Sequence, residues 1–128
     1  MPKYQDPTAV LDAKLDLVAA NCDQMHLVDT YVAGDSYAVV IAASLCAVAI
    51  SGVDWTKAAH TGNGRKATLA AKSGTASATA AAGDRHIALV DSVNSVVYHV
   101  TDETTDQAIT LGNPIDFPVI EIRENQPV

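Results

Sequence analysis

Aromatic residues and cations are both scarce in this chain of 128 residues. One Trp, four Tyr and one Phe supply few of the large anchors that line small-molecule pockets. Eight Lys and Arg residues stand against fifteen Asp and Glu residues, so the net charge is −7. Nucleic acids are bound by dense positive surfaces, which this composition lacks. We therefore expect no nucleic-acid partner and no cofactor, and an acidic surface that docks on a basic or mixed one.

Long apolar runs and cysteines are also few. The longest apolar run, residues 38–50, includes Ser44 and is shorter than the roughly 20 residues that span a bilayer. The polar N-terminal segment MPKYQDP predicts no signal peptide. Cys22 and Cys46 either form a disulfide or, as their apolar neighbours favour, remain small buried hydrophobes. We expect a protein made in a cytoplasm, without a membrane partner.

The apolar content, 48% of residues, is sufficient for one folded domain over residues 1–128. A helix is predicted near its start, because Asp6 can cap it, Pro7 fits the first turn, and apolar residues follow at roughly helical spacing. Those apolar residues are Val10, Leu11, Leu15, Leu17 and Val18. The predicted order is a flexible arm over 1–6, the helix over 7–21, a β-rich body over 25–123 and a tail over 124–128.

The body is read as short strands separated by turns. A strand over 25–29 and a turn over 32–35 lead to a short helix over 37–43, with a buried strand over 39–41 as the alternative. Further strands are predicted over 45–50, 53–56, 65–72, 75–80, 86–91, 96–101, 108–111 and 116–123, with turns at 61–64, 73–74, 82–84 and 112–114. Turn signals at this spacing predict a mainly β (α+β) fold: an N-terminal helix followed by a β-sandwich or small barrel of short antiparallel strands.

The segment from Arg85 to Thr101 is the clearest local pattern, two runs of mostly apolar, largely β-branched residues around a Ser/Asn turn, which indicates a β-hairpin. His86 and His99 lie one on each predicted strand. If they face each other, they could bind a transition ion or titrate together near neutral pH. The favoured interpretation is two independent sheet histidines, because no histidine pair in the chain has ligand spacing. We therefore expect no metal site.

Several short motifs point to catalysis or binding only superficially. Gly34-Asp35-Ser36 is similar to the nucleophile block of GDSL esterases, but Asp23 and His26 precede the serine instead of following it. The segment from Gly62 to Lys66 lacks the Walker pattern and fits a hairpin turn. The acidic stretch 101–106 lacks the glycine of a calcium loop. Trp55 is expected to be a core or interface anchor. We predict no catalytic residue and no enzymatic activity.

The stretch from Ser36 to Ile122 resembles a family of small virion structural proteins of tailed bacteriophages and prophages. The residues that carry the resemblance are Ser36–Ala38, Leu45–Ile50, Gly64–Lys66, Thr68–Gly74, Gly83–Asp91, Tyr98–Thr101 and Ile109–Pro114. They are packing and turn residues. The resemblance implies an N-terminal helix with a β-rich body, a place in the head or tail, and no enzymatic activity, so it supplies no catalytic residues.

Within that family we expect a capsid decoration (cement) protein at the virion surface. Its partners would be the major capsid protein and further copies of itself, with a cyclic trimer favoured. The candidate inter-subunit contacts are Met1, Pro2, Lys3, Tyr4, Gln5, Glu124, Asn125, Gln126, Pro127 and Val128. The alternatives are a minor tail protein, a receptor- or carbohydrate-binding module that uses Trp55, and a small hydrolase that uses Ser36.

Overall fold

The computed structural model describes residues 8–60, 64–103 and 107–125. The predicted arm 1–6 lies outside these residues, as do Pro7, part of the predicted turn at 61–64, half of the acidic stretch and most of the tail. The described chain divides into two compact units, each assembled from separate segments. Unit 1 takes residues 8–20, 51–60, 64–71 and 118–125, and unit 2 takes residues 21–50, 72–103 and 107–117.

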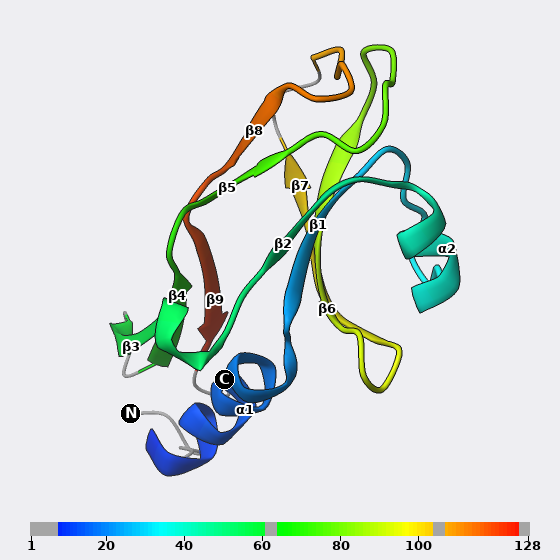
Figure 1. The fold of residues 1–128 in the computed structure, drawn as a ribbon. Coiled ribbons are helices and arrows are strands. Elements are labelled where there is room, and N and C mark those ends of the chain that lie inside the picture. Colours follow the sequence, from blue (N-terminus) through cyan, green and yellow to red (C-terminus); the bar gives the residue numbers. More distant parts are fainter. Residues whose placement is uncertain (1–7, 61–63, 104–106, 126–128) are drawn as a thin grey trace. The chain divides into compact units, whose positions relative to one another are not determined.

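Unit 1 combines the N-terminal helix with a three-stranded antiparallel sheet (Figure 1). Its elements are α1 (Thr8–Asn21), the short 3-10 helix η1 (Gly52–Asp54), β3 (Trp55–His60), β4 (Gly64–Leu69) and β9 (Ile120–Glu124), with the strand order β3-β4-β9. The predicted helix is confirmed over its described residues. Its buried side chains are Leu11 and Leu15, one turn apart, whereas Val10 and Leu17 of the predicted apolar set are exposed. The buried stripe of α1 is therefore narrower than its sequence suggests.

Unit 2 is built on a four-stranded antiparallel sheet in the order β2-β1-β6-β7. The elements are β1 (Gln24–Val28), α2 (Tyr37–Ala42), β2 (Ser44–Ala49), β6 (Arg85–Asp91) and β7 (Val96–Glu103), with a separate ribbon of β5 (Lys72–Thr75) and β8 (Pro114–Phe117). Fully buried Val28, Val40, Ala88 and Val90 form a core cluster between α2 and the sheet. The predicted strand, short helix and second strand over 25–50 are confirmed, as is the hairpin of β6 and β7.

The ribbon of β5 and β8 lies beside β2 (Figure 1). A Cβ atom on Gly74 would come within 2.7 Å of Val48 Cγ2 and 2.8 Å of Cys46 Sγ, which is closer than such atoms can approach. The backbone N–H of Ser77 donates to the carbonyl of Leu45 at 2.7 Å. Only glycine therefore allows β5 to approach β2 this closely.

Several predicted strand boundaries are wrong. The predicted strand 53–56 begins instead as η1, where the backbone N–H of Ser51 donates to Asp54 Oδ2 at 2.9 Å. The predicted turn at 73–74 lies inside β5, and the predicted strand that ends at Lys72 ends at Leu69. Thr75 of the predicted strand 75–80 belongs to β5, and the rest of that segment forms with the predicted strand 108–111 a single bridge, between Ala80 and Ile109.

The predicted last strand, 116–123, is two strands. β8 ends at Phe117 and β9 begins at Ile120, and the two belong to different units. Pro118 separates them, because proline has no N–H to continue a ladder. The chain passes from unit 2 to unit 1 at this break.

The fold class is confirmed at its coarser level: mainly β, with an N-terminal helix and antiparallel sheets. The three sheets of the described residues are open, so the predicted small barrel is wrong, while the sandwich stays a prediction. Within the described chain no helix is long and apolar enough to cross a membrane.

Candidate functional site

The hairpin of β6 and β7 places His86 opposite Asp102, not opposite His99. His99 pairs with Leu89 in the ladder. The turn between Asp91 and Val96, together with a bulge beside Leu89, fixes this register. The two histidines therefore do not face each other, because His99 lies three positions from the residue that faces His86, and the favoured interpretation of two independent sheet histidines agrees with this register.

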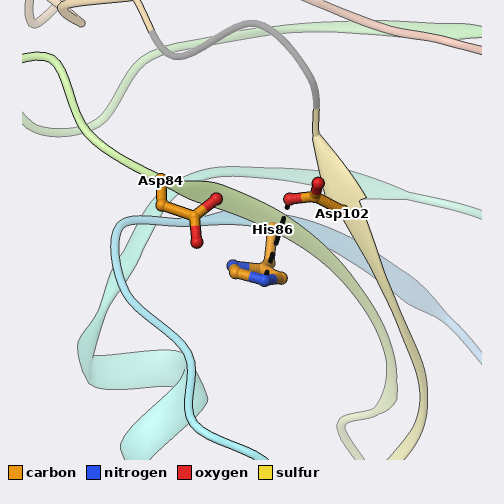
Figure 2. A group of neighbouring side chains, drawn as sticks. All are labelled: Asp84, His86 and Asp102. Carbon is orange, nitrogen blue, oxygen red and sulfur yellow. Dashed lines mark ion pairs between the residues drawn. The ribbon is translucent and has the colours of Figure 1, made fainter.

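Asp84, His86 and Asp102 form a cluster of possible ligands (Figure 2). One ligand atom from each residue lies within 4.8 Å of the other two. His86 Nε2 is 3.8 Å from Asp102 Oδ1, which is longer than a hydrogen bond. The His86 side chain is 19% exposed and that of Asp102 is 66% exposed, so the cluster opens to solvent on its carboxylate side.

Proximity along the chain brings Asp84 and His86 together, and strand pairing adds Asp102. Asp84 is the last loop residue before β6 and His86 is the second residue of that strand, so the two are close along the chain. Asp102 joins them through the ladder of β6 and β7. The Asp-x-His spacing was visible in the sequence, but the third residue depends on a strand register that the sequence analysis left open.

A cavity of about 460 Å³ lies beside the cluster in unit 2. Its lining residues are Asp29, Thr30, Tyr31 and Thr79–His86. The ring of Tyr31 is tilted by 50° against that of His86, with the centroids 5.6 Å apart. The His86 side chain and the loop that carries Asp84 therefore both line this cavity.

Arg85 holds the two walls of this cavity together. Its side chain is only 2% exposed, and its guanidinium forms hydrogen bonds with the carbonyl of Ala81 and an ion pair with the carboxylate of Asp29. A buried arginine needs such charged and polar partners to offset its lost hydration. Arg85 therefore fixes the position of the loop that ends at Asp84.

His26 is a structural histidine. Its Nδ1 lies 2.8 Å from Ser44 Oγ and its Nε2 lies 2.9 Å from Gln24 Oε1, so both ring nitrogens are engaged. Burial lowers the pKa of His26 below its usual value, partly opposed by Asp23, and burial likewise lowers the pKa of His99. Both rings are therefore held in the neutral form at neutral pH.

The residues of the predicted hydrolase alternative serve local structure. Ser36 caps α2 by accepting a hydrogen bond from Val39 N at 3.4 Å. Asp35 accepts from Val32 N at 2.9 Å. Asp23 accepts hydrogen bonds from the backbone and the hydroxyl of Ser92 in the turn between β6 and β7. The structure does not bring Ser36, Asp23 and His26 into one contact among the described residues.

The remaining candidate residues lie in unit 1 or outside the described chain. Trp55 begins β3 and is partly buried. Glu124 ends β9 and pairs with Lys14 of α1 at 3.6 Å, and Asn125 is exposed. Met1, Pro2, Lys3, Tyr4, Gln5, Gln126, Pro127 and Val128 lie outside the described residues.

Both cysteines are buried thiols, and no disulfide joins them. Burial raises the pKa of Cys22 to about 12, assisted by the negative charges of Asp91 and Asp23. Burial also raises the pKa of Cys46. The interpretation of the two cysteines as small buried hydrophobes is confirmed.

No protein-family model matches this chain, and comparison with curated proteins and with solved structures found no match.

Proposed function

We propose that this protein is a structural component of a tailed-phage virion, a decoration protein that binds the outer capsid lattice and stabilises the head. Its resemblance to small virion proteins over residues 36–122 motivates the proposal. The structural observation that supports it best is the open edge of β7. A structural protein of an assembly must bind neighbouring chains. An exposed strand edge allows this, because a strand of another chain can pair with its free backbone groups.

β7 is the terminal strand of the four-stranded sheet, and among the described residues no strand pairs with its outer edge. It runs for eight residues and includes three valines and a threonine, without proline or lysine to discourage pairing. The opposite edge, β2, is partly covered, because Leu45 accepts a hydrogen bond from Ser77. The outer edge of β7 is therefore more open than that of β2, and β7 is the edge strand available to a neighbouring chain.

Decoration would gain its strength from repetition. Each copy of a small protein buries a modest area, and avidity multiplies many weak contacts along a regular lattice. A cyclic trimer would present its contacts at a symmetry point of the capsid. In this proposal β7 joins the terminal segments Met1–Gln5 and Glu124–Val128 as a candidate for contacts between subunits, and the major capsid protein is the main partner.

The location of the protein in the virion tests the proposal directly. Virions of the phage or prophage that carries the gene are disrupted, heads and tails are separated on a gradient, and both fractions are analysed by quantitative mass spectrometry. We expect the protein in heads, at a fixed ratio to the major capsid protein. Recovery only with tails would overturn decoration in favour of the tail alternative, and absence from both fractions would overturn a virion role.

A matched pair of variants tests the edge of β7. Val96→Lys places a cation on the edge strand, where Val96 is 38% exposed, and Val53→Lys places one on η1, where Val53 is 91% exposed. Edge lysines discourage strand pairing. We expect sedimentation equilibrium to show self-association of the wild-type chain, weakened at least about tenfold by Val96→Lys alone. Equal self-association of all three proteins would remove β7 from the interface.

A further inference from the structure

We propose that Asp84, His86 and Asp102 bind one divalent transition-metal ion of the Zn²⁺ type at the edge of unit 2. One imidazole nitrogen and two carboxylate oxygens form a mixed donor set that suits Zn²⁺ and related first-row ions, whereas Mg²⁺ prefers oxygen ligands alone. The site supplies three protein ligands from two adjacent strands and the loop before them. It leaves further coordination positions to water or to a group from another molecule.

The distances fit such an ion after a small closure. Zn–N and Zn–O bonds of about 2.0–2.2 Å place two ligands of a tetrahedral ion about 3.4 Å apart. His86 Nε2 and Asp102 Oδ1 are 3.8 Å apart, and all three ligand atoms lie within 4.8 Å. Asp84 and Asp102 are exposed, so rotation of their side chains can close the remaining gap without moving the backbone.

His86 is available to an ion in a way that His26 is not. Both nitrogens of His26 are within hydrogen-bond distance of side-chain oxygens. In contrast, His86 Nδ1 is buried without a hydrogen-bond partner among the described residues, and Nε2 lies beyond hydrogen-bond distance of Asp102. The ion would bind at Nε2, the nitrogen nearer Asp102, because Nδ1 is buried. Metal binding at His86 Nε2 would therefore break no hydrogen bond to Asp102.

The surroundings hold the ligands in place and leave the site net negative. The Tyr31 ring packs at a tilt against His86, which restricts the orientation of the imidazole. Arg85 is buried and anchors the preceding loop through Ala81 and Asp29, so its charge is balanced by Asp29. The carboxylates of Asp84 and Asp102 then lie together beside the imidazole. A cation would relieve their mutual repulsion.

Zinc binding by the untagged full chain tests the proposal. Isothermal titration of the wild-type protein with Zn²⁺ is expected to show one equivalent bound per chain, and titration with Mg²⁺ none at that site. His86→Ala, Asp84→Asn and Asp102→Asn should each weaken Zn²⁺ binding at least about tenfold, because each removes a ligand. His60→Ala removes an imidazole from β3 in unit 1 and should leave the affinity unchanged.

A second measurement does not depend on variants. Co²⁺ or Mn²⁺ added to the isotopically labelled wild-type chain should broaden the amide resonances around residues 84–86 and 102 before any others. Saturable one-equivalent binding that survives His86→Ala, or broadening centred elsewhere, would overturn the site. Absence of saturable Zn²⁺ binding would overturn it as well. The virion proposal is tested by location and self-association and is unaffected by either outcome.

Discussion

Arg65 of β4 donates two hydrogen bonds to the carboxylate of Asp12 on α1, from Nε to Oδ1 at 2.8 Å and from Nη2 to Oδ2 at 3.3 Å. The other two strands of the same sheet also pair with the helix. Lys57 of β3 reaches Asp16 at 2.7 Å, and Glu124 of β9 lies 3.6 Å from Lys14. Each strand of unit 1 is therefore tied to α1 by at least one ion pair, in addition to the apolar contacts of the helix.

Neutralising Asp12 should make unit 1 less stable and less sensitive to acid. The hydrogen bonds from Arg65 hold the pKa of Asp12 below its usual value of 3.8. A lowered carboxyl pKa adds stability above the ordinary pKa, and that stability is lost as pH falls through the folded value. We expect Asp12→Asn to lower the urea midpoint at neutral pH and to reduce its decline below about pH 4.

Asp16→Asn serves as the matched control on the same helix, because Asp16 is 54% exposed and pairs with a single cation, Lys57, among the described residues. Exposed ion pairs contribute little to stability. Urea titrations of the two variants at neutral and acidic pH make the comparison. If Asp16→Asn lowered the urea midpoint as much as Asp12→Asn or more, the bidentate pair of Asp12 and Arg65 would not be the main ion pair that stabilises unit 1.

A methyl group on Gly74 should separate β5 from β2. The added Cβ would lie 2.7 Å from Val48 Cγ2 and 2.8 Å from Cys46 Sγ, so one of the packed side chains must move. Overpacking of this kind costs about 1–3 kcal/mol, and we expect Gly74→Ala to lower the free energy of unfolding by that amount.

Gly52→Ala is the control for the change of residue type, because a Cβ on Gly52 meets no atom within 4 Å. This variant should leave the free energy of unfolding unchanged or raise it by up to about 1 kcal/mol, because alanine reduces the conformational entropy of the unfolded chain. Chemical denaturation of both variants gives the comparison. If Gly74→Ala were as stable as Gly52→Ala, the close approach of β5 to β2 would be wrong.

The stability of unit 2 should fall as the pH drops below about 6.5, well before the carboxylates titrate. Burial lowers the pKa values of His26 and His99 from the ordinary value of 6.5. The unfolded chain then binds protons in a range where the folded chain does not, so protonation favours unfolding. We expect the urea midpoint to decline between about pH 7 and pH 5. His26→Gln combined with His99→Gln should flatten this decline, and an unchanged slope in the double variant would contradict the assignment.

The two thiols should be almost inert in the folded protein. Raising the pKa of Cys22 from 9.0 to about 12 reduces its thiolate fraction about a thousandfold at moderate pH, and the thiolate is the reactive form. Iodoacetamide labelling followed by mass spectrometry should modify Cys22 and Cys46 rapidly in urea and very slowly in native buffer. Comparable labelling rates in the two conditions would contradict their burial.

Local patterns in the sequence predicted much of the architecture. The N-terminal helix, the short helix before β2 and the hairpin of β6 and β7 were all identified, because apolar spacing, caps and turn residues act over a few positions. The weak predictions fell in the segment 70–84, rich in Ala, Ser and Gly. Small side chains there give little alternation, and Gly74 was taken for a turn although its lack of a side chain serves a close contact with β2.

By itself, the sequence determined a mainly β chain with an N-terminal helix and an acidic surface, since composition and short-range patterns suffice for these. Only the tertiary structure decided that His86 meets Asp102 and that Arg85 is buried. It also decided that Pro118 separates two strands of different units. Each of these depends on a register or a contact between distant segments. A shift of a few positions in the ladder leaves the local pattern unchanged but gives His86 a different neighbour.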